Sequence, residues 1–146
     1  MDDTPSFTWD DRYLLGHPAM DDTHREFVEC VQALLSAPDA QLPAALDAFA
    51  RHARAHFGEE DRWMADNGFP AADCHMDEHA RVLASVAEGQ AAIATGDSEL
   101  VRNLAQALQT WFPAHADYLD SALAQWLVKR SHGGAPLVFR RTPAPG

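Results

Sequence analysis

Apolar residues recur every three or four positions along four long stretches of the chain. This spacing places them on one face of a helix, whereas a half-buried strand would alternate every second residue. The sequence therefore predicts an all-α fold, an up-down-up-down antiparallel four-helix bundle with short connections between neighbouring helices. Residues that interrupt helices separate the stretches, namely Pro38, Gly68, Pro70 and Gly96.

The stretches set the expected limits of the four helices. The first begins near Asp21 or Asp22, where a side-chain oxygen can cap the first turn, and it ends before Pro38. On the fourth helix the expected inward face consists of Leu100, Leu104, Leu108, Trp111, His115, Leu119, Leu123 and Trp126. In chain order, the second, third and fourth helices are expected over about 42–67, 71–95 and 97–128.

The ends of the chain read differently from the helical stretches. Gly16 and Pro18 interrupt regular structure near the N-terminus, so we expect residues 1–20 to form an arm packed as a loop on the bundle. The bundle itself is expected over 21–130. Glycines and prolines recur in 131–146, which predicts a short, flexible and disordered C-terminal tail.

Composition narrows the class of protein. A chain of 146 residues suits one domain, and a net charge of -11 disfavours nucleic acid as a partner because like charges repel. No apolar run approaches the roughly 18 residues of a membrane span, and the start MDDTPSFTWDD lacks the basic and apolar parts of a secretory signal. Cys30 and Cys74 form no C-x-x-C pair, which predicts reduced, buried thiols. We expect a cytoplasmic monomer without a membrane partner.

Histidines occur on the apolar face of every predicted helix. They are His24, His56, His75 with His79, and His115. Glu60 lies four residues after His56, and no Lys or Arg lies on these faces to neutralise it. A buried carboxylate without a partner is costly, and a multivalent cation would remove that cost. The pattern therefore favours a metal site over ordinary core histidines.

The ligand types also restrict the metal. Imidazole suits zinc, copper, iron or nickel, whereas magnesium and calcium prefer oxygen ligands. Five imidazoles exceed what one ion normally takes from a protein, so we expect two ions bridged by carboxylates. Glu60 is one bridge, and the second should come from the fourth helix, which already supplies His115.

With these residues in place, the chain resembles the hemerythrin family, in particular its single-domain bacterial members. The resemblance covers about residues 9–127. It rests on Trp9, MDDTH at 20–24, HFGEE at 56–60, HMDEH at 75–79 and WFPAHADYLD at 111–120.

The resemblance implies reversible O2 binding, for storage, delivery or sensing, at a non-haem di-iron centre rather than an enzymatic activity. It assigns His75, His79 and His115 to one iron and His24 and His56 to the other. Glu60 and Asp120 would bridge the pair together with an oxo or hydroxo group derived from solvent. O2 would bind at the open position of the iron that has two histidines.

Asp120 and Phe112 both lie on the predicted fourth helix, and each gives a further expectation. Asp120 follows His115 by five residues, which is about 140° around an ideal helix. Since Pro113 also removes a backbone donor, we predict a kink or a wide turn such as a π-bulge within 109–120. Phe112 either lines the O2 pocket or is ordinary core packing, and the sequence favours neither.

Other functions stay open at this point. A di-iron enzyme acting on peroxide, nitric oxide or O2 is one alternative, and an iron- or zinc-handling protein is another. HMDEH also fits the H-x-x-E-H pattern of zinc proteases, with Glu78 activating water, but that leaves the remaining histidines unexplained. His52, one turn before His56, is not expected to be a ligand, and His17 is expected at the surface or beside the pocket.

Overall fold

The computed structural model describes residues 7–131, and nearly all of them belong to helices. In chain order the long helices are α1 (Pro18–Ser36), α2 (Leu42–Asp66), α3 (Ala72–Ala94), α4 (Ser98–His115) and α5 (Ser121–Ser131). Short segments connect or precede them: η1 (Asp11–Tyr13), η2 (Asp39–Gln41) and η3 (Ala116–Asp120).

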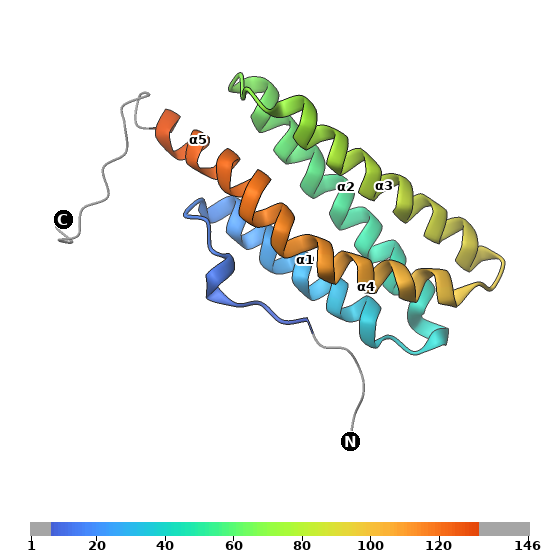
Figure 1. The fold of residues 1–146 in the computed structure, drawn as a ribbon. Coiled ribbons are helices and arrows are strands. Elements are labelled where there is room, and N and C mark those ends of the chain that lie inside the picture. Colours follow the sequence, from blue (N-terminus) through green and yellow to red (C-terminus); the bar gives the residue numbers. More distant parts are fainter. Residues whose placement is uncertain (1–6, 132–146) are drawn as a thin grey trace.

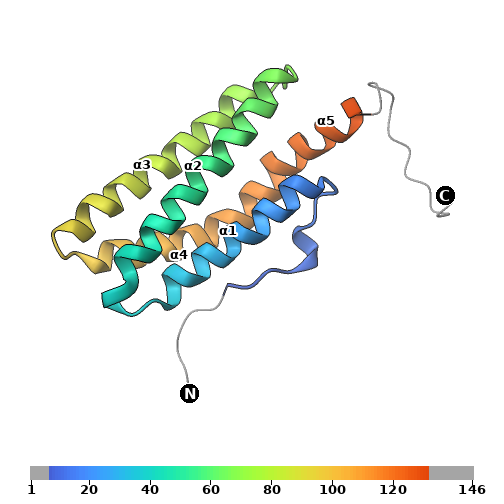
Figure 2. The same ribbon diagram turned by 180° about the vertical axis from the view of Figure 1, so that it is seen from behind.

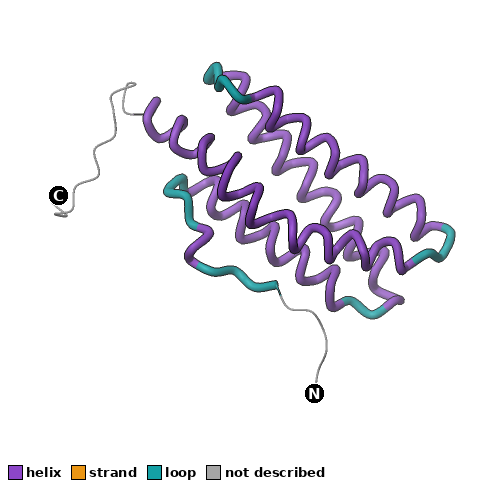
Figure 3. Tube along the Cα trace, in the orientation of Figure 1, coloured by secondary structure: helices purple, strands orange, loops and turns teal. Residues whose placement is uncertain are grey.

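The predicted all-α four-helix bundle is confirmed. α4, η3 and α5 follow one another as a single rod, which runs beside α1 and α3, while α2 packs between α1 and α3 (Figure 1). The view from behind shows the same ring of antiparallel neighbours (Figure 2). Within residues 7–131 there is no strand (Figure 3). No helix in this part of the chain has the length and apolar character needed to cross a membrane.

The expected start of the first helix is wrong by about three residues. α1 begins at Pro18, and Nδ1 of His17 caps it by accepting a hydrogen bond from the Met20 amide. Proline suits this first position because its missing N–H would have no partner there. Asp21 lies inside the helix, where its carboxylate accepts from the amides of Leu15 and Gly16 at 2.8 and 3.2 Å. Asp21, which was expected to cap the helix, therefore anchors the preceding arm instead.

The predicted wide turn in the fourth helix is confirmed. Residues Ala116–Asp120 form one π-helical turn, closed by a hydrogen bond from the Ser121 amide to the Ala116 carbonyl. Pro113 lies just before it, inside α4. The turn accommodates one residue more than an α-turn. The helix axis therefore keeps its direction, but the side chains after the turn are rotated around that axis.

Two apolar clusters fill the bundle, one on each side of a polar layer. The larger cluster includes Phe27, Phe49, Phe57 and Phe112, and the smaller one is built around Met20, Met64, Phe69 and Leu123. Leu100, expected to face inward, is exposed, and Val101 is buried in its place. The register of α4 near its start therefore differs from the predicted one by one residue.

Residues 7–17 of the expected arm lie along the bundle. Phe7 and Tyr13 are buried, and both rings meet the ring of Phe112 edge-on. Trp9 packs against Tyr13 and against the guanidinium of Arg25 in α1. The arm thus covers the seam between α1 and α4. The predicted tail, 131–146, lies outside the described residues except for Ser131.

Candidate metal centre

The seven candidate ligands that the sequence singled out come together in the polar layer between the two apolar clusters. Each is buried, with no more than 4% of its surface exposed. α1 supplies His24, α2 supplies His56 and Glu60, and α3 supplies His75 and His79. The rod formed by α4, η3 and α5 supplies His115 from α4 and Asp120 from the π-turn η3.

Helix geometry explains how each pair of ligands converges. Residues four apart on an α-helix point in nearly the same direction, so His56 Nε2 reaches Glu60 Oε2 at 2.8 Å. His75 and His79 pair in the same way, with ring centroids 4.5 Å apart. Asp120 is five residues after His115, yet the π-turn brings its Oδ1 within 3.2 Å of His115 Nε2.

The two oxygens of Glu60 face different histidines. Oε2 lies 3.2 Å from His24 Nε2 and 2.8 Å from His56 Nε2. Oε1 lies 3.2 Å from His79 Nε2 and 3.8 Å from His75 Nε2. One carboxylate therefore joins a group of two histidines to a group of three.

Asp120 divides its oxygens in the same way. Oδ1 lies 2.9 Å from His75 Nε2 and 3.2 Å from His115 Nε2, whereas Oδ2 lies 3.0 Å from His24 Nε2. The ligand atoms thus form two clusters that each lie within 4.8 Å. We call them the three-histidine group (His75, His79, His115) and the two-histidine group (His24, His56).

The contacts of these atoms suit a metal better than hydrogen bonding. Six buried atoms lie close to one another but are not aligned as hydrogen-bond partners: Nε2 of His75, His79 and His115, Oε1 of Glu60, and both Asp120 oxygens. Atoms bound to one ion at about 2.1 Å and at right angles would be about 3 Å apart. Buried polar atoms that stay unpaired are costly, and a cation shared by them would remove the cost. The donor set fits two cations.

The charge balance of the cluster leads to the same conclusion. Burial opposes the charged form of His24, but the adjacent carboxylates of Asp120 and Glu60 outweigh it and raise its pKa to about 10. Burial likewise opposes ionisation of both carboxylates, yet the surrounding histidines keep the pKa of Glu60 and of Asp120 below their usual values. The carboxylates therefore stay ionised and attract positive charge into the layer.

Two further carboxylates contact the histidines from outside; the sequence did not indicate Asp61, and it indicated Glu78 only in the zinc-protease alternative. His79 Nδ1 lies 2.8 Å from Asp61 Oδ1, and His115 Nδ1 lies 2.7 Å from Glu78 Oε1. The same Glu78 oxygen accepts a hydrogen bond from Trp111 Nε1 at 3.1 Å. Asp61 and Glu78 have side chains about one-third exposed, so they link the buried rings to the surface.

The other candidate residues lie outside both clusters. His52 is half-buried, and its Nδ1 lies 3.9 Å from Glu26 Oε1 at the outer side of the bundle. Burial and repulsion from His56 lower the pKa of His52 to about 4. His17 caps α1 and packs against Trp63. Cys74 is exposed and Cys30 only half-buried, so the expectation of buried thiols is wrong for both.

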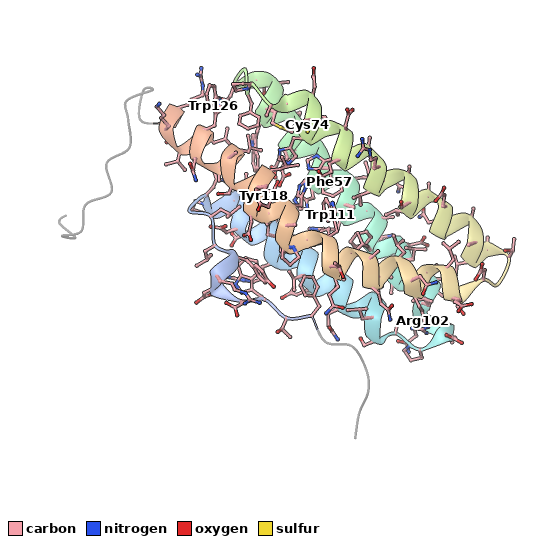
Figure 4. The ribbon with its side chains drawn as sticks, viewed as in Figure 1. Phe57, Cys74, Arg102, Trp111, Tyr118 and Trp126 are labelled. Atoms are coloured by element: carbon pink, nitrogen blue, oxygen red, sulfur yellow. The ribbon has the colours of Figure 1, made fainter. Side chains whose placement is uncertain are left out.

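Aromatic rings surround the ligands. Phe112 meets His24 edge-on at 5.3 Å and stacks on Phe27 at 5.1 Å. Phe57 and Trp111 lie near the middle of the bundle (Figure 4), where each stacks on a ligand: Phe57 on His79 and Trp111 on His115. Phe112 packs in the core, and its ring also contacts the candidate ligand His24; that it lines an O2 pocket stays a prediction.

A groove of about 620 Å³ opens between α3 and α4 on the outer side of the three-histidine group. Its lining includes Glu78, Trp111 and His115 near the centre, and Tyr118 at the exposed rim. Most of the lining is apolar, with Arg81 as its cationic residue.

Comparison with known proteins gives one consistent result. Residues 15–127 match the family model described as Hemerythrin HHE cation binding domain. A protein named bacteriohemerythrin from Ralstonia nicotianae is 38% identical over 126 residues, which cover 86% of this chain and 92% of that protein. Crystal structures of two leucine variants of hemerythrin, to alanine and to tyrosine, superpose with TM-scores of 0.75 and 0.74. Their identities are 21% and 20%, and each alignment covers 82% of this chain and 95% of that chain.

Proposed function

This chain belongs to the hemerythrin family, and from that premise we propose that it binds O2 reversibly at a pair of iron ions inside the bundle. One observation supports this proposal above all others. Glu60 and Asp120 each direct one oxygen to the two-histidine group and the other oxygen to the three-histidine group. This is the arrangement that two carboxylates bridging two ions would require.

The ligands divide accordingly. His75, His79 and His115 would hold one iron, and His24 and His56 would hold the other, with Glu60 and Asp120 shared between the two. The ion held by two histidines would have one protein ligand fewer than its neighbour. An open coordination position on that side is where a small ligand such as O2 would bind.

The ligand chemistry fits iron, for which imidazole is a suitable donor. When bound by these residues, a pair of ferrous ions would supply the two electrons that O2 binding requires and recover them on its release. The protein's own part is to fix the ligands and to keep the site dry. Imidazoles, which would be neutral when bound to iron, outnumber carboxylates here, and we expect this to disfavour the high oxidation states used by oxidising enzymes.

The wall beside the two-histidine group is apolar and closely packed. Phe112 and Phe27 are both buried, and Phe112 contacts His24 directly. Phe7 and Tyr13 of the arm cover Phe112 from outside. Such a wall admits an uncharged gas but excludes water and charged reductants, which favours release of O2 over its reduction.

The purified protein provides the test. We expect two irons per chain by elemental analysis. We also expect a visible charge-transfer band that appears when the reduced protein takes up O2, disappears when O2 is removed, and returns over repeated cycles. The matched pair His56→Ala and His52→Ala should differ: the first loses one or both irons and the band, and the second keeps both. Rapid consumption of peroxide or nitric oxide with irreversible bleaching would point instead to a di-iron enzyme. Zinc as the native metal would exclude both functions.

A further inference from the structure

The two histidine groups differ in what the second ring nitrogen contacts. In the three-histidine group, Nδ1 of His79 and of His115 each lie within 2.8 Å of a carboxylate oxygen, whereas Nδ1 of His75 has no hydrogen-bond partner among residues 7–131. In the two-histidine group, no residue between 7 and 131 forms a hydrogen bond with Nδ1 of His24 or His56. All these rings are buried, so a difference in exposure does not account for the contrast.

A carboxylate at one ring nitrogen changes what the other nitrogen can do. It holds the proton on Nδ1, which leaves the lone pair on Nε2, and it fixes the orientation of the ring and strengthens its donor character. Asp61 and Glu78 are placed to do this for His79 and His115. His24 and His56 are oriented mainly through Nε2 contacts with Glu60 and Asp120, the same atoms that would have to face an ion.

The anchored rings are also held across their faces. Phe57 stacks on His79 with centroids 4.1 Å apart and planes at 8°, and Trp111 stacks on His115 at 4.2 Å and 26°. Glu78 fixes both members of the second pair, because its Oε1 accepts from Trp111 Nε1 as well as from His115 Nδ1. His24 instead meets Phe112 edge-on, at an interplanar angle of 89°. Each anchored ring therefore has a carboxylate at its edge and an aromatic ring against its face.

We propose that Asp61 and Glu78 are positioning residues that make the three-histidine group the tighter of the two metal positions, the one that fills first and empties last. The inference rests on the proposed function only in requiring two metal positions. Its physical basis is preorganisation, since a site whose ligands are already oriented loses less conformational freedom on binding an ion. The more weakly held ion would then be the one with the open position.

The test measures iron release from the full-length, iron-loaded protein rather than O2 binding. The protein is reduced with dithionite under argon and mixed with an excess of a chelator that forms a coloured ferrous complex. For the unsubstituted protein we expect two phases of one iron each. Glu78→Gln and Asp61→Asn should each speed the slow phase, by about 10- to 100-fold, and leave the fast phase unchanged.

Matched controls separate ring positioning from a simple loss of charge. Asp77→Asn on α3 and Asp66→Asn on α2 remove the same charge at exposed positions of the same helices, and both should release iron as the unsubstituted protein does. If the controls speed the slow phase as much, or if both phases change together in Glu78→Gln, the proposal is wrong. Should circular dichroism show that Glu78→Gln does not fold, Asp61→Asn decides the question alone, because it acts on the other ring.

The outcomes also distinguish this inference from the proposed function. A protein that carries two irons but fails to bind O2 reversibly would contradict the proposed function, and two phases of iron release with the slow phase faster in Glu78→Gln and Asp61→Asn would still support the inference. A protein that binds O2 reversibly but releases both irons in a single phase would overturn the inference alone.

Discussion

The two flanks of the metal centre are built differently. On the flank of α1 and the arm, Phe7, Tyr13, Phe27 and Phe112 are all buried and pack against one another over His24. On the flank between α3 and α4, a groove of about 620 Å³ leads inward to Glu78 and the stacked rings behind it. One flank is sealed by apolar rings, and the other is partly open and charged.

The difference follows from what each histidine group needs. In the proposed function the two-histidine group takes up O2, and an apolar wall that excludes water would benefit such a position; the apolar seal adjoins this group. Ligands that must be held rigidly benefit from charged hydrogen-bond acceptors, and a carboxylate keeps its charge more cheaply when it is partly solvated. Asp61 and Glu78 are about one-third exposed and support the three-histidine group. Three kinds of substitution test this contrast: one that affects both flanks, two that affect only the sealed flank, and one that affects only the open flank.

The largest effect is expected from Glu60, which belongs to both histidine groups. Glu60→Ala removes an oxygen ligand from each, so we expect the protein to lose both irons, as measured by iron per chain after purification. Glu59→Ala is the matched control, because Glu59 is half-buried and lies outside both clusters; it should keep two irons. Retention of two irons by Glu60→Ala would show that the two groups do not depend on this shared carboxylate.

Phe112→Ala should have the next largest effect and should act on the sealed flank. The ring is 1% exposed, so its removal leaves a cavity and should lower the free energy of unfolding by about 3–5 kcal/mol. Urea unfolding of the iron-loaded protein measures this. We also expect faster loss of the oxygenated band on standing, because water reaches the two-histidine group. An unchanged decay rate would mean that Phe112 is not part of the dry wall.

Asp21→Ala should weaken the same flank at a distance from the metal. The amides of Leu15 and Gly16 would lose their acceptor, at a cost of about 1–3 kcal/mol in the free energy of unfolding. We expect faster hydrogen exchange at these two amides with both irons retained. Asp22→Ala, at the exposed neighbouring position, should leave their exchange unchanged. Equal acceleration in both variants would argue against a specific anchor for the arm.

Tyr118→Ala should have the smallest effect. Tyr118 is 78% exposed at the rim of the open groove, so the free energy of unfolding should stay within about 0.5 kcal/mol of the unsubstituted value. Iron content should also stay the same. A loss of iron would show that the groove rim supports the three-histidine group more directly than its contacts indicate.

The parts of the molecule that follow helical periodicity could be predicted from the sequence. Histidines on apolar faces place ligands in the core, and the five-residue step from His115 to Asp120 indicated the wide turn that is found at Ala116–Asp120. The limits of α2 and α3 were also close to those expected. These features depend on spacing within one helix, which a sequence records directly.

Features that depend on contacts between distant segments were missed. Asp61 supports a histidine of another helix, and so does Glu78, so no local spacing reveals either contact. The start of α1 was misplaced because Asp21 looks like a helix cap in sequence, whereas its carboxylate binds amides of the preceding arm. In both cases the polar partner is fixed only when the chain has folded.

The π-turn in the fourth rod has a consequence for how the length of this helix can vary. The hydrogen bond of the π-turn spans five residues instead of the four of an α-turn. Side chains after Ser121 therefore point in the directions they would have in a regular α-helix that lacked one residue. The turn is thus equivalent to a single-residue insertion whose effect on register ends where the turn ends. Deletion of the exposed Tyr118 would leave a histidine and an aspartate four residues apart on an unbroken α-helix, so we expect the shortened protein to retain iron.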